Sequence, residues 1–274
     1  MRILIVATNL LVLEDLLKFG AQIVCRISEV PTILLAFDCT SDRLPPSEEA
    51  FQAQVQALDC YAGASTKIRI GYVADQIMEE LGENSYDLVI MSEHAPIHCL
   101  ARLWRKSIVT QVVEHTNCPV LIVRGEIRTI EHILLCDSGG DSSPLLSRLT
   151  AQLADLLAGE EQITILHVMS QISAGPGVVG KQLRADAQEL MAANTPEGRM
   201  LAQDLQVLTK PKVHSQPKVR HGLVLDEILS EAHNGNYDLV VIGAHRGEGW
   251  QRHLLDNLAQ KIIEQIDRPV LVVK

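Results

Sequence analysis

The chain repeats parts of itself over a long distance, and this feature constrains its fold more than any other. The repeated segments are Lys67–Ile77 with Lys218–Ile228, Tyr86–Met91 with Tyr237–Ile242, and Cys118–Val123 with Arg268–Val273. The first two pairs share one offset, and the third departs from it by one residue. Because this period is far longer than the roughly 20 to 50 residues of a solenoid repeat, it predicts two related domains in tandem.

Composition agrees with two globular domains and excludes one class of function. The chain has 274 residues, of which 47% are hydrophobic and 21% charged. We expect domains at residues 1–125 and 130–274, joined by a short linker. A net charge of −10 and an aromatic content of 3% argue against sequence-general binding of nucleic acid.

The cysteines and the N-terminus indicate a cytoplasmic protein. The six cysteines form no CxxC pair and lie far apart in the sequence, which fits a reducing compartment better than a disulfide framework. The apolar run Ile3–Leu13 follows Arg2 like a signal peptide, but Thr8 and Asn9 interrupt it and no cleavage site follows. We therefore interpret this run as a first strand that turns into a helix.

Each half alternates short apolar runs with helical segments. The predicted strands are Ile3–Val6, Thr32–Phe37, Lys67–Ile70, Leu88–Met91 and a last one ending at Val123, then Ile133–Cys136, Ile163–Val168, Lys218–His221, Leu239–Ile242 and a last one ending at Val273. Runs without polar alternation, separated by helices, predict parallel sheets covered on both faces. We expect an α/β chain of two doubly wound domains, each with a five-stranded parallel sheet.

The two halves differ between their second and third strands. The second half has helical segments near Gln182–Ala193 and after Thr195, where a cap residue precedes Pro196 and Glu197. The first half has only residues 47–62 in this place.

Ligands of such sheets lie beyond the carboxyl ends of the strands, where the chain direction switches. In the second half that crevice would be lined by Asp137–Asp141 and by the glycine-rich segment Gly243–Gly249. Glycines let backbone N–H groups approach an anion at the start of a helix. The alternative is that these glycines only serve a tight turn between strand and helix.

Three other motifs do not support a site. Gly175–Gly180 matches GxGxxG but follows the second strand of its half, and Pro176 removes one N–H group. His94, His98 and Cys99 would lie at the opposite edge of the sheet from His115 and Cys118, too far apart to bind one zinc ion. No catalytic set with interpretable spacing appears, so we expect no enzyme.

Taken in order, these segments resemble the universal stress protein superfamily. The matching residues are Asp137 and the small polar turn after it, Leu166–Val168, Gly222 after Val219, Tyr237–Gly243 and Arg268–Val273. The resemblance covers nearly the whole chain as a tandem pair and is weakest in residues 38–65 and 170–216.

The resemblance implies the strand order 3-2-1-4-5, pairing of domains through their last strands and, in one subgroup, ATP held by G-x2-G-x9-G-S/T. By position, Asp137 would meet the nucleoside, Val168 would lie along adenine and Gly243 would begin the phosphate loop. The residues expected to bind a cofactor in this half are Asp137, Val168, Gly243, Arg246, Gly247 and Asn257.

The ATP motif is only partly present. Arg246 stands three residues after Gly243, glycine is displaced to Gly247, and Asp256–Asn257 replaces the final Gly-Ser/Thr pair. The first half departs further: Ala7–Thr8 stands where Asp137 is expected, Ser92 replaces the first glycine, Ala95 and Pro96 the next, and Arg105–Lys106 the final pair.

We interpret the chain as a tandem protein whose first half has lost the nucleotide site and whose second half keeps a partial one. The leading hypothesis is a non-catalytic stress-response or signalling module that acts through a protein partner or a weakly bound ligand. The alternative is a switch that binds ATP in the second domain, with slow ATP hydrolysis. A third hypothesis is an enzyme or electron-transfer protein on the same general fold.

The last strand of each half also bears on assembly. Val270–Val273 is apolar and uncharged, so we expect it to be paired rather than left as an open edge. We predict that it pairs with Val120–Val123 about a pseudo-twofold axis, which gives an intramolecular pseudo-dimer. Association of two chains is a further alternative.

Overall fold

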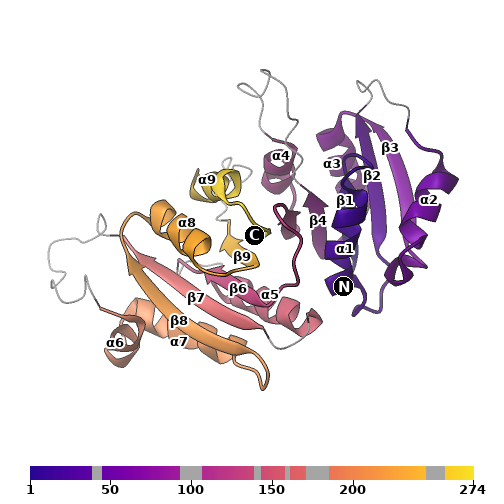
Figure 1. Cartoon of the computed structure of the whole chain (residues 1–274). Helices are drawn as coiled ribbons and strands as arrows, with labels where there is room; N and C mark the ends of the chain where they lie inside the picture. Colours follow the sequence, from indigo (N-terminus) through magenta and orange to yellow (C-terminus); the bar gives the residue numbers. More distant parts are fainter. Residues whose placement is uncertain (39–44, 93–106, 139–142, 158–160, 171–184, 245–256) are drawn as a thin grey trace. The chain divides into compact units, whose positions relative to one another are not determined.

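The computed structural model describes residues 1–38, 45–92, 107–138, 143–157, 161–170, 185–244 and 257–274. These residues form two compact units, one spanning Met1–Thr129 and the other beginning at Ile130. Each unit is an α/β layer structure with a parallel sheet, as the sequence predicts (Figure 1).

The first unit has strands in the order β3-β2-β1-β4-β5, all parallel. The strands are β1 Ile3–Ala7, β2 Thr32–Asp38, β3 Ser65–Gly71, β4 Leu88–Ser92 and β5 Val120–Val123. The helices are α1 Leu13–Val24, α2 Glu48–Gln56, α3 Val73–Glu83 and α4 Ile108–His115, with a 3-10 turn η1 at Asp59–Tyr61. Helix α1 contacts η1, whereas α3 contacts α4.

The second unit has the same topology, in the order β8-β7-β6-β9-β10. The strands are β6 His132–Cys136, β7 Gln162–Met169, β8 His214–His221, β9 Leu239–Gly243 and β10 Val270–Val273. The helices are α5 Ser143–Leu156, α6 Ala187–Ala192, α7 Pro196–Leu208, α8 Val224–Asn234 and α9 Asn257–Gln265. Figure 1 shows α8 and α9 on one face of this sheet and α5 to α7 on the other. The order 3-2-1-4-5 is therefore confirmed in both units.

Several strands are buried along their whole length, because helices cover both faces of the sheets. Every residue of β1, β4, β5 and β10 is buried. Such strands show no alternation in sequence, which is typical of parallel sheets under two helical layers.

The outermost strand β8 begins earlier than the sequence predicts. We expected it to start at Lys218, just after Pro217, but it starts at His214 and pairs Pro217 with Ile165 of β7. Proline removes a hydrogen-bond donor, and a strand with a neighbour on only one side can turn that position outward. The proline is therefore tolerated because β8 lies at the edge of its sheet.

A buried glutamate in the first unit explains most of the repeated segments. Glu80 of α3 is fully buried. It accepts hydrogen bonds from Lys67 Nζ at 2.6 Å, Arg69 Nε at 3.1 Å, Asn84 Nδ2 at 2.8 Å and the Tyr86 hydroxyl at 2.7 Å. Lys67 and Arg69 are two residues apart on β3, so both side chains point to the same face. One carboxylate thus joins a strand, a helix and the start of the next strand.

The second unit repeats this arrangement around Glu231 of α8, which is also buried. Glu231 accepts from Lys218 Nζ at 2.8 Å, Arg220 Nη1 at 2.7 Å and the Tyr237 hydroxyl at 2.7 Å. Burial alone would raise the pKa of Glu231, but hydrogen bonds from Lys218, Tyr237 and Arg220 hold it below its ordinary value. Glu231 is therefore ionised at neutral pH, and its contribution to stability is lost as the pH falls through that lowered pKa.

The aspartate of each Tyr-Asp pair holds the start of the first strand of its unit. Asp87 Oδ2 accepts from the backbone N–H of Arg2 at 2.7 Å. Asp238 Oδ2 accepts from the N–H groups of Glu131 at 3.0 Å and His132 at 2.9 Å. The repeated Tyr-Asp pair thus provides hydrogen bonds that hold the fold of each unit together.

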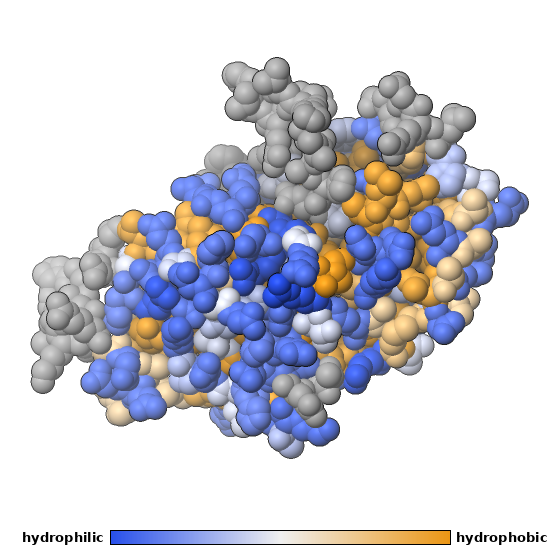
Figure 2. Space-filling view, in the orientation of Figure 1, coloured by the Kyte–Doolittle hydropathy of each residue, from blue (hydrophilic) through white to orange (hydrophobic). Residues whose placement is uncertain are grey.

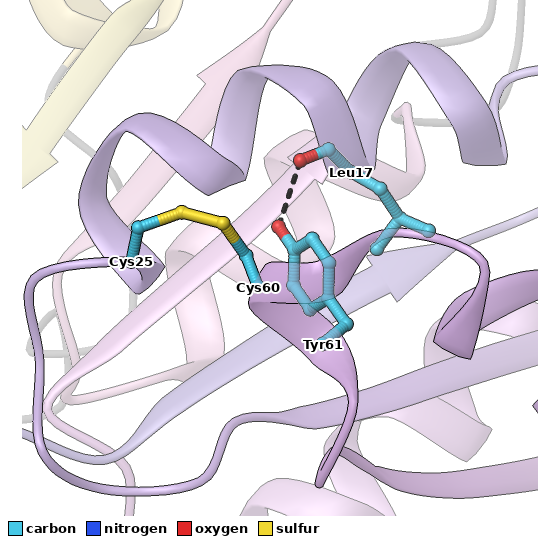
Figure 3. The surroundings of a disulfide bond; sticks show 4 residues. All are labelled: Leu17, Cys25, Cys60 and Tyr61. Atoms are coloured by element: carbon cyan, nitrogen blue, oxygen red, sulfur yellow. Dashed lines mark hydrogen bonds between the residues drawn. A yellow bond between two sulfur atoms is a disulfide. The ribbon is translucent and has the colours of Figure 1, made fainter.

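The structure corrects the expectation that the cysteines are unpaired. Cys25, at the C-terminus of α1, and Cys60, in η1, form a disulfide with a Cα–Cα distance of 5.2 Å (Figure 3). Beside it, the buried Tyr61 hydroxyl donates to the Leu17 carbonyl of α1 at 2.7 Å. The sequence could not indicate this pair, because the two cysteines lie 35 positions apart and only the packing of η1 on α1 brings them together.

The described surface is mixed in character. On the face shown in Figure 2, hydrophobic areas (orange) are interrupted by hydrophilic residues (blue). Among the described residues, no helix combines the length and the apolar character that crossing a bilayer requires.

Replacing Glu80 tests the network of hydrogen bonds and ion pairs around its carboxylate. Glu80→Gln removes the buried charge that pairs with Lys67 and Arg69 and places an amide NH2 group among their donors, so we expect the free energy of unfolding to fall by about 3 kcal/mol. Urea unfolding of the full chain measures the change. The matched control is Glu79→Gln, because Glu79 is 52% exposed and lies 3.3 Å from Arg69 Nη1. The control should change the same quantity by less than about 1 kcal/mol, and equal effects would contradict this account.

Reduction tests the disulfide. Both cysteines are exposed, so a thiol reductant can reach them. Breaking the bond frees the chain between α1 and η1, and we expect a loss of about 2–4 kcal/mol in the free energy of unfolding. Unfolding with and without reductant measures it, with the Cys25→Ser/Cys60→Ser double variant as control. A double variant as stable as the oxidised chain would refute the expected stabilisation.

Candidate functional site

The carboxyl edge of the second sheet brings together two of the residues predicted to bind a ligand, Asp137 and Gly243. Cys136, the last residue of β6, pairs with Ile242 of β9 and with Leu166 of β7. Asp137 and Gly243 therefore follow neighbouring positions of adjacent strands. The chain leaves β6 toward α5 and leaves β9 toward α9, which lie on opposite faces of the sheet, so this is the switch point of the fold.

The backbone of Asp137 is held in place by β7. Its N–H donates to the Leu166 carbonyl at 3.0 Å, and its own carbonyl oxygen lies 3.0 Å from His167 Nδ1. The Asp137 and His167 side chains are both buried, with 4% and 8% exposed. The backbone of Asp137 thus continues the contact of β6 with β7 beyond the end of the strand.

The carboxyl group of Asp137 faces a second buried aspartate that sequence reasoning missed. Asp204 of α7 is 1% exposed, and its Oδ1 accepts a hydrogen bond from the Ser147 hydroxyl of α5 at 2.6 Å. Burial foremost, and then the nearby Asp137 carboxyl, raise the pKa of Asp204 to about 7, although the Ser147 hydroxyl opposes this rise. Two buried carboxyl groups therefore meet behind the edge where the ligand was expected.

The sequence does contain a signal for Asp204. In α7, Asp204 shares the buried helix face with Met200, Leu201 and Leu208. An acid on the apolar stripe of an amphipathic helix indicates a buried polar contact. We had used this segment only to predict a helix, and its cap is as expected, because the Thr195 hydroxyl accepts from the Gly198 N–H at 3.0 Å.

The other described candidates are less buried than Asp137. Val168 and Gly243 are half-buried near the ends of β7 and β9. Asn257 is exposed and is the first residue of α9, the crossover between β9 and β10. Arg246 and Gly247 lie outside the described residues, as do most of the expected phosphate loop and Asp141.

The corresponding edge of the first unit has a different chemistry. Val6 pairs with Met91 as Cys136 pairs with Ile242, so Ala7 occupies the place of Asp137 and Ser92 that of Gly243. Ala7 is fully buried. Ser92 is also buried, and its hydroxyl has no hydrogen-bond partner among the residues that the structure describes. No carboxylate therefore stands at the end of β1.

A hollow of about 400 Å³ in the first unit lies at the opposite edge of its sheet. Its lining includes Asn84, Tyr86, His115 and Cys118. Burial raises the pKa of the Cys118 thiol to about 12, so this cysteine is not a nucleophile at neutral pH. Within the described parts of the chain, no three His, Cys, Asp or Glu side chains are grouped to hold a metal ion.

Comparisons with known proteins identify the family. The model of the universal stress protein family matches residues 19–124 and again residues 129–274. No curated protein sequence matches the chain.

Solved structures agree with this match. A universal stress protein from Archaeoglobus fulgidus is 14% identical, with a TM-score of 0.65 over 100% of this chain and 96% of its own. A putative universal stress protein and a functionally unknown protein, both from Pseudomonas aeruginosa, are each 18% identical, with TM-scores of 0.66 over 100% of this chain and 92% of theirs. Shorter structures matching 54% of the chain include universal stress proteins in complex with dAMP and with cAMP, at TM-scores of 0.36 and 0.40.

Both halves match one family model, and both have the α/β fold with strand order 3-2-1-4-5. The chain belongs to the universal stress protein family and contains two tandem domains of that family.

Proposed function

We propose that this chain is a non-catalytic stress-response module in which the second domain holds a small ligand weakly and the first domain holds none. The observation that carries the proposal is the contrast between the two carboxyl edges. Asp137 and Gly243 stand side by side at the end of β6 and β9, whereas Ala7 and Ser92 take these places in the first domain. At this point the second domain has a carboxylate to accept hydrogen bonds from ligand hydroxyl or amino groups, whereas the first domain has only the Ser92 hydroxyl.

The burial of Asp137 supports weak binding. Asp137 is 4% exposed, and its carboxyl group is already near Asp204 of the same chain. A ligand that hydrogen-bonds to Asp137 must displace or share existing contacts, and desolvated polar groups that are imperfectly paired reduce affinity. For the first domain, which we propose holds no ligand, we propose action through a protein partner.

The second candidate is an ATP-dependent switch in the second domain. It is favoured by the position of Gly243 at the end of β9 beside Asp137, where the phosphate loop of the family begins. Asn257, at the first residue of α9, replaces the serine or threonine of that motif, and Asp256 adds a carboxylate that would repel phosphate oxygens. We therefore place this candidate second.

A cytoplasmic location and the pairing of Val270–Val273 with Val120–Val123 in an intramolecular pseudo-dimer stay predictions. The predicted pseudo-dimer fits the proposal, because two unlike domains paired in one chain would present two different surfaces to partners.

Ligand-induced stabilisation separates the two candidates. A weak site should add about 0.4 kcal/mol to the free energy of unfolding when the ligand equals its dissociation constant, and a switch site at a hundred times that constant about 2.7 kcal/mol. Thermal unfolding with a series of ATP–Mg²⁺ concentrations up to the millimolar range measures this stabilisation, and phosphate release reports hydrolysis. We expect stabilisation only near millimolar ATP and no phosphate release.

Two variants assign the site. Asp137→Asn should abolish the ligand-induced shift, because it removes the carboxylate acceptor without changing its size. Thr8→Ala, at the corresponding edge of the first domain, should leave the shift unchanged. A shift that survives Asp137→Asn but is lost in Thr8→Ala would place the ligand in the first domain and refute the proposal.

A further inference from the structure

The pair of carboxyl groups in the second domain contains an unsatisfied buried oxygen. Ser147 donates to Oδ1 of Asp204, but Oδ2 of Asp204 is buried without a hydrogen-bond partner in the described part of the chain. The buried Asp137 carboxyl is close enough to raise the pKa of Asp204 by its charge. A buried acceptor without a donor is costly, so this oxygen requires a proton or a cation.

The groups around Asp137 and Asp204 favour a proton, and not a cation, as the partner of the unsatisfied Asp204 oxygen. Asp137 faces Asp204 from the end of β6, and Ser147 contacts it from α5. On β7, His167 Nδ1 is directed at the Asp137 carbonyl, and on β8, His221 Nε2 lies 3.0 Å from the Ala185 carbonyl. Two adjacent buried carboxyl groups cannot both ionise easily, and one of them keeps a proton that it donates to the other.

The second aspartate comes from a segment that distinguishes the two domains. Helix α7 packs on α5, β7 and β8, and its Gly198 approaches α6 so closely that a Cβ atom there would lie 2.1 Å from the Leu190 carbonyl oxygen. The helix in the same place of the first domain, α2, buries Phe51 and Val55 instead. Asp204 therefore occurs in the domain that has Asp137 and the proposed ligand edge.

We propose that Asp204 is a positioning residue for Asp137, and that the two share one proton which couples ligand binding at this edge to pH. With the proton present, Asp204 donates to Asp137 and holds the Asp137 carboxylate toward the ligand. When the proton leaves, two carboxylates repel each other, α7 and the end of β6 separate, and Asp137 is displaced. The inference rests on the ligand site proposed above for the second domain.

A measurement without ligand tests the shared proton. The pKa of Asp204 is about 7 in the folded chain and 3.8 in its ordinary state, so the folded chain binds this proton more tightly. The stability that this bound proton contributes is present at low pH and is lost as the pH rises from about 4 to 7. Melting temperatures of the full chain and of Asp204→Asn are compared between pH 5 and 9. The melting temperature of Asp204→Asn should rise relative to that of the native chain as the pH rises. A difference in melting temperature that does not depend on pH would overturn the proposal.

Ser147→Ala tests whether Asp204 positions Asp137 through a shared proton or only packs against its neighbours. Because the Ser147 hydroxyl lowers the pKa of Asp204, its removal should move the pH-dependent step to higher pH while Asp204 is retained. A purely structural role would lower the melting temperature equally at every pH. If Mg²⁺ alone stabilises the native chain at pH 8 but not Asp204→Asn, a cation occupies the pair and the proposal fails.

Adenosine, which does not titrate in this range, tests the coupling. If only the protonated pair binds, the dissociation constant should be about tenfold higher at pH 8 than at pH 6 in the native chain. It should be nearly constant in Asp204→Asn, whose amide can donate to Asp137 at every pH. Equal pH dependence in both proteins would overturn the coupling. Absence of adenosine binding in both would refute the proposed adenosine-type ligand, and the ligand-free titration would still decide whether the proton is shared.

Discussion

A buried glutamate in each domain holds the third strand, the helix that follows it and the start of the fourth strand. Glu80 and Glu231 each accept hydrogen bonds from a lysine and an arginine of one strand and from a tyrosine further along the chain. A buried carboxylate that loses its positively charged partners is strongly destabilised, because its charge is then left unpaired. This requirement accounts for the repetition of the lysine, arginine, glutamate and tyrosine at fixed spacing.

The carboxyl edges of the sheets are under no such requirement, and there the two domains differ. The end of β1 has Ala7 and the end of β6 has Asp137, although the strands before them pair in the same register. The backbone that builds the crevice is therefore common to both domains, while the side chains that would recognise a ligand are not. Fold and ligand recognition are therefore separable in this chain, because different residues determine them.

Much of this architecture was predictable from the residues. The apolar runs predicted the parallel strands, and the cap at Thr195 predicted the start of α7, because these signals act over a few neighbouring residues. The edge strand β8 extends through Pro217, which local reasoning treats as a break. The cost of a proline depends on whether its missing N–H faces a neighbouring strand, and that is a property of the sheet and not of the segment.

The sequence alone established the duplication, the α/β class and the contrast between Asp137 and Ala7, since each can be seen in residue types and their spacing. Only the tertiary structure paired Cys25 with Cys60, gathered four donors around Glu80 and placed Asp204 against Asp137. These contacts join residues that are distant in the chain, and their energies depend on burial. Burial is decided by how helices and strands pack, and no pattern of neighbouring residues contains that information.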